Sequence, residues 1–256
     1  MIRSIALVLL SSLVYIGGTL NASAIYAAEL PTDIESFHFN PPKDGIPDNT
    51  TGGASRNPDR CRHQETATKA SNITLLAPNS FMGHTISAQP AFFLYAEATL
   101  AQKVFVNIEN ERGEVAYSGY QSLPTDTGLI RIIFPEDASS LTPNIIYKIT
   151  VVPVCADILR PDDPALVGYV KRISNLPFQS TNSFRSAFEE AMMYAESGIW
   201  YDTLVLLEQT LRDDPTFGSV NAAWNMLLAI GELTQFDLTL NAAPVSDCRD
   251  SLCSLP

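Results

Sequence analysis

Basic side chains and histidines are scarce in this sequence. The 256 residues include 16 Lys and Arg against 28 Asp and Glu, so the formal net charge is -12. A chain this negative repels phosphate, which disfavours nucleic-acid binding. The three histidines are His38, His63 and His84, and only His63 has a cysteine nearby, at Cys61. One such pair supplies half of a zinc site, so we expect no bound metal.

Catalytic motifs are also missing. No Gly-x-Ser-x-Gly elbow occurs, and Gly52-Gly53 lacks the Lys-Ser/Thr partner of a phosphate-binding loop. Asp126-Thr127-Gly128 is the pattern of an aspartic-protease carboxylate, but that chemistry needs two carboxylates, and a turn between strands explains the triplet. Asp157, Asp162 and Asp163 lack the alternating spacing of a calcium loop. We therefore expect a non-enzymatic protein with no cofactor, and a hydrolase with an unrecognised site is an alternative.

Long apolar runs are confined to the N-terminus. Arg3 precedes a nearly continuous apolar run over residues 5–16, and Ala22-Ser23-Ala24 follows with the small residues of a signal-peptidase site. The run is shorter than the roughly 20 residues that span a bilayer, and no later run is longer. We expect residues 1–28 to be a signal peptide, and the mature protein to be exported, periplasmic or extracellular, with no membrane span.

Four cysteines lie beyond this signal, at Cys61, Cys155, Cys248 and Cys253. An even number in an oxidising compartment predicts disulfides, for which three pairings exist. We favour Cys61 with Cys155 and Cys248 with Cys253, because the second pair closes a short loop in the tail at residues 237–256.

Two periodicities divide the rest of the chain. Residues 29–70 are rich in Pro, Asp, Asn and Gly and have neither period, which predicts an extended linker. Over residues 71–176 the period is two, and turn residues separate the runs. This pattern predicts a mainly β domain, an antiparallel immunoglobulin- or fibronectin-like sandwich. Its seven expected strands lie at residues 73–77, 91–96, 103–109, 114–121, 129–134, 145–154 and 166–173.

One tyrosine supports this fold class. Leu141-Thr142-Pro143 precedes Tyr147, which begins an alternating run. In immunoglobulin-like domains a tyrosine at this corner bonds back to the chain. We expect Tyr147 to do the same.

From residue 177 to 236 the period becomes 3.6, which predicts an α-helical hairpin and a third helix. Asn182 or Ser183 can cap the first helix, Gly198 permits a tight reversal, and Pro215 ends the second helix. The spacing of small and aromatic residues is similar to a tetratricopeptide repeat.

A single repeat cannot bury its own apolar face, so this hairpin must dock on the sandwich or on a partner. The candidate docking residues are Tyr194, Trp200, Tyr201, Asp202 and Trp224. A partly buried Asp202 needs a partner, for which Arg185 and Arg212 are candidates. We expect Asp202 to clamp the hairpin to the sandwich, and a contact with a ligand or partner is the alternative.

The whole chain resembles a family of exported, mostly cyanobacterial proteins, the one numbered nine-two-eight among the domains of unknown function. The resemblance runs from residue 39 to about residue 233. It rests on segments such as Phe39-Asn40-Pro41-Pro42, Leu75-Leu76-Ala77-Pro78 and, above all, residues 194–202, Tyr-Ala-Glu-Ser-Gly-Ile-Trp-Tyr-Asp. It implies an exported sandwich-plus-hairpin architecture and supplies no catalytic residues.

Both predicted halves belong to architectures used mainly for binding. We therefore expect an exported adaptor that binds another protein of the cell envelope. A carbohydrate-binding sandwich is the alternative, with Tyr95, Tyr117 and Tyr120 as the residues that would stack on sugar rings of a glycan.

Overall fold

The computed structural model describes residues 37–47, 73–96, 99, 101–123, 128–135, 138–154, 159–160, 163–174, 186–233, 246–249 and 252–254. The predicted signal peptide, most of the predicted linker, Cys61 and Cys155 lie outside the described residues.

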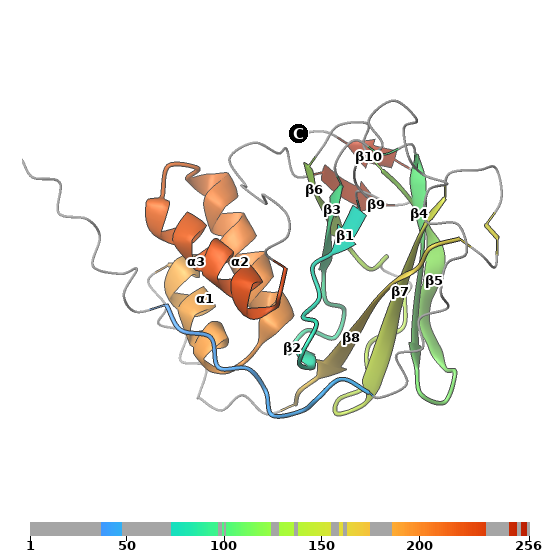
Figure 1. Ribbon diagram of the computed structural model, residues 1–256, viewed down its shortest axis with the longest axis horizontal. Coiled ribbons are helices and arrows are strands. Elements are labelled where there is room, and N and C mark those ends of the chain that lie inside the picture. Colours follow the sequence, from blue (N-terminus) through green and yellow to red (C-terminus); the bar gives the residue numbers. More distant parts are fainter. Residues whose placement is uncertain are drawn as a thin grey trace, which may run out of the picture. The chain divides into compact units, whose positions relative to one another are not determined.

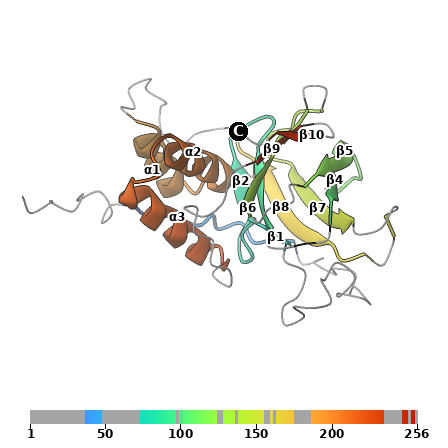
Figure 2. The same ribbon diagram turned by 90° about the horizontal axis from the view of Figure 1, so that it is seen from above.

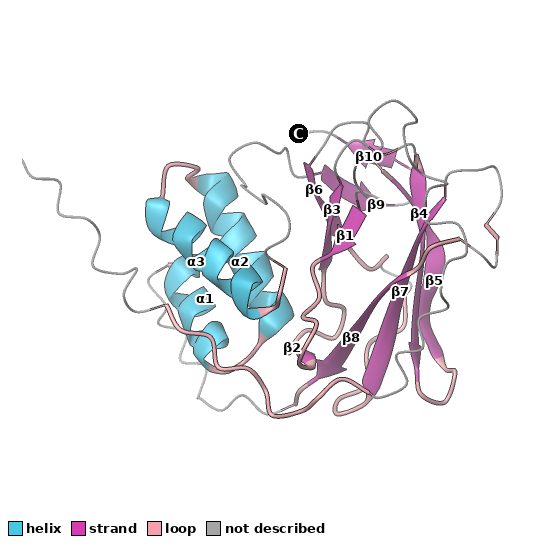
Figure 3. Cartoon of the chain, in the orientation of Figure 1, coloured by secondary structure: helices cyan, strands magenta, loops and turns pink. Residues whose placement is uncertain are grey.

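The described chain is mainly β, with two sheets followed by three helices (Figures 1 and 3). The first sheet has the order β1-β3-β6-β9-β10 and the second the order β2-β8-β7-β4-β5. The strands of the first sheet are β1 (Ile73–Leu75), β3 (Phe92–Ala96), β6 (Gly128–Ile132), β9 (Ser246–Arg249) and β10 (Leu252–Ser254). Those of the second are β2 (Gly83–Thr85), β4 (Lys103–Asn110), β5 (Val115–Ser122), β7 (Ile146–Val154) and β8 (Leu166–Arg172).

Each of the seven predicted strands is present, within a few residues of its expected bounds. The expectation of a wholly antiparallel arrangement is wrong at two places, because β2 pairs with β8, and β6 with β9, in parallel. Parallel neighbours need a long connection rather than a tight hairpin. Here β2 lies far from β8 in the sequence, and the helices separate β6 from β9.

A hydrophobic core fills the space between the two sheets. In β4 the burial alternates, and Val104, Val106 and Ile108 are the buried side chains on the inner face. The sheets approach closely where β1 meets β8. There a Cβ on Gly168 would lie 2.6 Å from that of Ala77, so only glycine fits at this contact.

The corner predicted at Tyr147 is present. Its hydroxyl accepts a hydrogen bond from the backbone N–H of Thr142 at 3.2 Å, and its ring is buried. The bond ties the start of β7 to the preceding loop.

Three helices follow, α1 (Ala187–Glu196), α2 (Trp200–Asp213) and α3 (Gly218–Ile230). The cap of α1 is Ser186, whose side chain accepts from the Glu189 N–H, rather than the predicted Asn182 or Ser183, which lie outside the described residues. Gly198 makes the predicted reversal with φ of 73°, a conformation that favours glycine.

The helices cover the outer face of the first sheet (Figures 1 and 2). Phe93 alternates with the core-facing Leu94, so its ring points out of the sandwich, and it meets Trp224 of α3 edge to face at 6.3 Å. Arg131, opposite Phe93 on β6, reaches Glu208 of α2. The order of layers is therefore helices, first sheet, second sheet.

Residues 37–47, which we call the strap, run without regular secondary structure from α1 to the ends of β2 and β8 (blue in Figure 1). Phe39 is buried, and its ring centroid lies 5.6 Å from that of Trp200. The Asn40 N–H donates to the Ala195 carbonyl at 3.1 Å. At the other end, the Asp44 carboxylate accepts from Lys171 Nζ at 2.7 Å. This part of the predicted linker is therefore fixed to both helices and sheets.

Candidate functional site

The predicted docking residues lie where the helices meet the sheets. Trp200 is completely buried and its indole N–H donates to the Leu76 carbonyl at 3.0 Å. Phe39 and Phe81 pack on its ring, each with centroids 5.6 Å away. The protein's own strap and β1 region therefore cover Trp200.

The Tyr201 side chain is also buried in the interior. Its hydroxyl donates to the Tyr169 carbonyl at 2.9 Å, and its ring meets Phe92 edge-on at 5.0 Å. A Cβ on Gly83 would lie 2.5 Å from the ring, so the absence of a side chain at Gly83 makes room for it. Burial raises the pKa of the Tyr201 phenol, which stays protonated as a donor.

Asp202 links α2 to the segment after β2. Its carboxylate Oδ2 accepts from the Ile86 N–H at 3.1 Å, and the Thr85 hydroxyl also donates to it. Burial raises the pKa of this carboxyl, and these donors partly oppose the rise. Of the two expected arginine partners, Arg212 is bound to Glu208, and Arg185 lies outside the described residues. Among the described residues, backbone and hydroxyl groups are the donors to Asp202.

Tyr194 and Trp224 complete the predicted set. The Tyr194 hydroxyl donates to Glu190 Oε1 at 2.8 Å, and burial together with this carboxylate raises the pKa of the phenol. Trp224 is 1% exposed, and its indole N–H has no acceptor among the described residues. The structure thus gathers all five residues at the helical layer, with Trp200, Tyr201 and Trp224 fully buried.

A pocket of about 210 Å³ lies beside Tyr201, between α2 and the first sheet. Most of its lining surface is apolar. Its residues come from the end of β2 and the β2–β3 connection, from β6 and its continuation, and from α1 and α2: Thr85, Ser87, Gln89, Pro90, Ala91, Arg131, Ile133, Tyr194, Tyr201, Asp202, Val205 and Leu206. An apolar pocket with few polar groups is the usual form of a ligand site.

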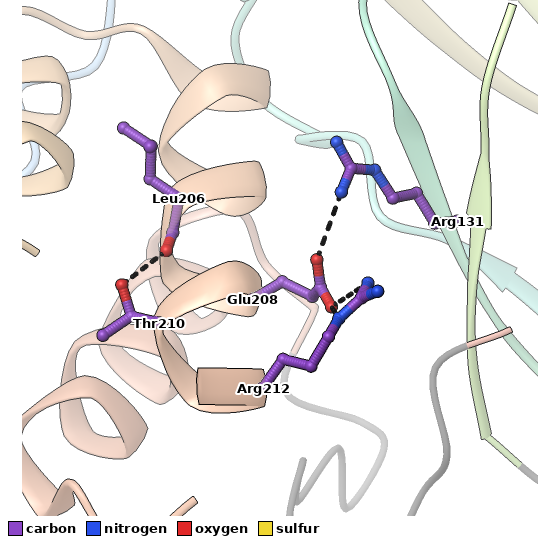
Figure 4. Close-up of polar contacts among 5 residues, drawn as sticks. All are labelled: Arg131, Leu206, Glu208, Thr210 and Arg212. Atoms are coloured by element: carbon purple, nitrogen blue, oxygen red, sulfur yellow. Dashed lines mark hydrogen bonds and ion pairs between the residues drawn. The ribbon is translucent and has the colours of Figure 1, made fainter. Parts of the chain in front are cut away.

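A charge cluster that the sequence analysis missed borders this pocket (Figure 4). The Glu208 side chain is completely buried between two guanidinium groups. Arg212 donates to Oε1 from Nη2 at 2.6 Å and from Nε at 2.9 Å, and Arg131 Nη1 forms an ion pair with Oε2 at 3.5 Å. A buried carboxylate is tolerated only when it is paired in this way. The spacing of Glu208 and Arg212 indicates an ordinary helix-surface pair, so the sequence contained no sign of Arg131.

Other residues singled out from the sequence lie apart from the pocket. Asp126 and Thr127 are outside the described residues, and Gly128 begins β6. Asp163 accepts from the Arg160 N–H at 2.8 Å and so stabilises a turn. Cys248 and Cys253 are register partners across β9 and β10, which places their backbones opposite each other, and their disulfide remains a prediction.

The three tyrosines proposed for glycan stacking do not share a face. Tyr95 is buried and points the same way as Phe93, while Tyr117 packs against Phe134 with ring centroids 6.0 Å apart. Tyr120 is exposed on β5.

Within the described part of the chain, no three His, Cys, Asp or Glu side chains cluster as metal ligands would. No helix among these residues has the length and apolar character needed to cross a bilayer.

Comparison with known families assigns the chain. The family Domain of Unknown Function (DUF928) matches residues 51–239. The chain belongs to DUF928. This DUF928 match contains every residue that lines the pocket, and the strap precedes it. Neither the curated proteins nor the solved structures include a match to the chain.

Proposed function

We propose that this DUF928 protein is a non-catalytic, exported adaptor of the cell envelope, which holds a partner protein at the pocket between α2 and the first sheet. The observation that carries the proposal is the pocket itself. Most of its lining surface is apolar and comes from both layers, and its volume suits one inserted side chain.

The proposed architecture is an immunoglobulin-like sandwich with a tetratricopeptide-like hairpin docked on one face. The orders β1-β3-β6 and β8-β7-β4, with β2 parallel to β8 at the edge, support the first part, as does the Tyr147 hydrogen bond. The tight reversal at Gly198 between α1 and α2 supports the second.

Because the helices pack on the sheet, the partner-binding surface that we propose differs from the one expected for a free hairpin. A free tetratricopeptide-like hairpin would present Trp200 to a partner, but here the strap and the β1 region cover it. The pocket is where helical and β side chains together still border open space. A partner that inserts a side chain there contacts both layers at once.

The polar groups of the pocket favour binding over catalysis. Asp202 is the one carboxylate among the lining residues, and backbone and hydroxyl donors hold it. Acid and base catalysis by paired carboxylates needs a second such group at the same place.

Site-directed photo-crosslinking in the native envelope tests the proposal. A photoreactive amino acid replaces Ser87, which lines the pocket, and in a matched control it replaces Met226, an exposed residue of α3 that does not line it. We expect one defined protein adduct from position 87 and none from 226. The adduct should vanish when Val205→Phe fills the pocket. Equal adducts from both positions, or none from 87, would refute the adaptor.

A carbohydrate-binding role is the second candidate, and one observation favours it. Tyr120 is 48% exposed on β5, its ring lies 5.2 Å from that of Phe105, and Lys103 Nζ lies 4.9 Å from its centroid. Exposed aromatic rings of this kind stack on sugars. Retention on envelope polysaccharide that Tyr120→Ala abolishes would favour this role.

A further inference from the structure

Arg131 is the only cationic side chain among the residues that line the pocket. It rises from β6, and Nη1 faces Glu208 (Figure 4). Its other terminal nitrogen points away from Glu208 in the same view. The ion pair with Glu208 thus engages one nitrogen of the Arg131 guanidinium, Nη1.

The remaining donors of Arg131 have the geometry of a carboxylate fork. Nε is buried and has no acceptor among the described residues. When Nη1 is directed elsewhere, the N–H groups of Nε and Nη2 lie parallel on one side of the guanidinium, where a carboxylate binds through both oxygens. A buried N–H without an acceptor is rare in folded proteins and indicates an absent polar partner.

The charge balance of the cluster agrees with an anionic partner. Two guanidinium groups, of Arg131 and Arg212, flank the single carboxylate of Glu208, which leaves one positive charge in excess. Asp202 lines the same pocket, so a second anionic group on the ligand would be repelled. A single carboxylate on an otherwise apolar group suits both conditions.

The size of the pocket limits the apolar group. An engineered cavity of about 150 Å³ holds a benzene ring, and this pocket measures about 210 Å³. It therefore accommodates one branched or aromatic side chain together with a carboxylate. Pro90, Ile133, Val205 and Leu206 supply apolar contacts for that side chain.

We propose that Arg131 binds the free C-terminal carboxylate of a partner chain whose last residue is apolar and lies in this pocket. The inference rests on the proposed adaptor function and adds the identity of the anchoring group. A small apolar carboxylic acid has the same chemistry but lacks the amide N–H of a chain terminus. The carboxylate of Asp202 offers that N–H an acceptor in the same pocket.

The test is an NMR titration of the full mature chain with three probes: N-acetyl-leucine, N-acetyl-leucinamide and 4-methylpentanoate. We expect N-acetyl-leucine to bind at least about tenfold more tightly than the amide, as a charge-assisted bidentate pair requires. Arg131→Gln should remove this preference. Arg212→Gln, the matched control, also removes a guanidinium from Glu208 but does not line the pocket, and it should reduce the preference less than Arg131→Gln does, because the fork of Arg131 remains.

Arg131→Lys guards against a folding artefact, because it retains a charge beside Glu208 and loses the fork. It should unfold cooperatively, as the parent does, and bind N-acetyl-leucine several-fold more weakly.

Equal affinity for N-acetyl-leucine and its amide, or no binding of either, overturns the carboxylate site. Crosslinking from position 87 then decides separately whether the adaptor function stands. If 4-methylpentanoate binds as tightly as N-acetyl-leucine, the carboxylate site holds but a chain terminus as its source is refuted.

Discussion

Two carboxylates on α2, the buried Glu208 and the partly buried Asp202, are stabilised by different donors. Asp202, at the start of the helix, receives uncharged N–H and O–H groups, while Glu208 lies between two arginines. A charged donor stabilises a buried carboxylate more strongly than a neutral one does. Asp202 is therefore the carboxylate whose protonation should influence the stability of the fold.

The substitution Asp202→Asn tests this expectation. Burial raises the pKa of this carboxyl above its ordinary value, so the folded state binds the proton more tightly than the unfolded state does. The stability that this proton contributes is fully present below the unfolded pKa and is lost as the pH rises through the folded pKa. Relative to Asp202→Asn, the parent protein should thus lose stability as the pH rises from about 4 through the raised pKa of Asp202. Urea unfolding of both proteins across this range measures the difference, and a constant difference would contradict the expected shift.

At the scale of single residues, the sequence was a better guide to burial than to hydrogen-bond and ion-pair partners. Helical spacing and an aromatic neighbourhood were enough to predict that Trp200 and Tyr201 are covered, but not by which surface. The donors to Asp202 are the Thr85 hydroxyl and backbone groups after β2, and none of them is an arginine or another charged group that sequence reasoning would pair with a carboxylate. Arg131 meets Glu208 only because β6 lies under α2, a long-range contact that local periodicity cannot reveal.

The α1–α2 turn is the element that depends most on one residue type. Gly198 has a φ of 73°, and a Cβ there would lie 2.6 Å from the Asn40 carbonyl oxygen of the strap. Its backbone conformation and its close neighbour therefore both require glycine.

Gly198→Ala should lower the free energy of unfolding by about 1–3 kcal/mol, because it combines a strained backbone with a clash. Gly218→Ala is the matched control: Gly218 begins α3 with open space around it, so alanine should be neutral or stabilising by up to about 1 kcal/mol. Gly113→Ala has positive φ but no close neighbour, and it isolates the cost of the backbone conformation. Chemical denaturation measures the free energy of unfolding of the three variants. A smaller decrease for Gly198→Ala than for Gly113→Ala would show that the strap moves aside at little cost in free energy.

Among the elements, all were predicted except three short strands, and β1, also short, was predicted from a longer apolar run over residues 73–77. The seven predicted strands and three helices each have an apolar pattern of their own. The strands β2, β9 and β10 have three or four residues each, too few to establish a period, and their neighbours hold them in place. The two parallel pairings involve two of these short strands.

On the scale of the whole molecule, the helices are a structural layer of the protein. Trp200 packs with Phe39 and Phe81 and is bonded to Leu76, so helix, strap and β region share one core. Elements that share a core should unfold together.

Trp200→Ala should therefore destabilise both halves, by about 3–5 kcal/mol. Far-UV circular dichroism near the helical minima and fluorescence of the remaining Trp224 should give coincident transitions at a lower denaturant concentration. Met226→Ala, at an exposed site on α3, should shift neither by more than about 0.5 kcal/mol. Helical signal lost well before the rest would contradict the shared core.

The two periodicities of the sequence predicted a sandwich and a hairpin, and they left open whether the hairpin docks on the sandwich or on a partner. Amphipathic faces show that each part must be covered, but not which surface covers it. Phe93 and Phe92 are neighbours on one strand, and both are buried. That pattern marks a sheet covered on both faces, and it was the available sign of a third layer.

The strap also has a consequence for when folding can finish. Asn40 bonds to Glu196 across 156 positions of sequence, so a segment made early has its docking surface made much later. On a ribosome, or during passage through a narrow channel, residues 37–47 must wait until the helices have emerged behind them. The native structure is therefore closed by its earliest described residues, and a chain interrupted before α2 lacks the surface that would hold them.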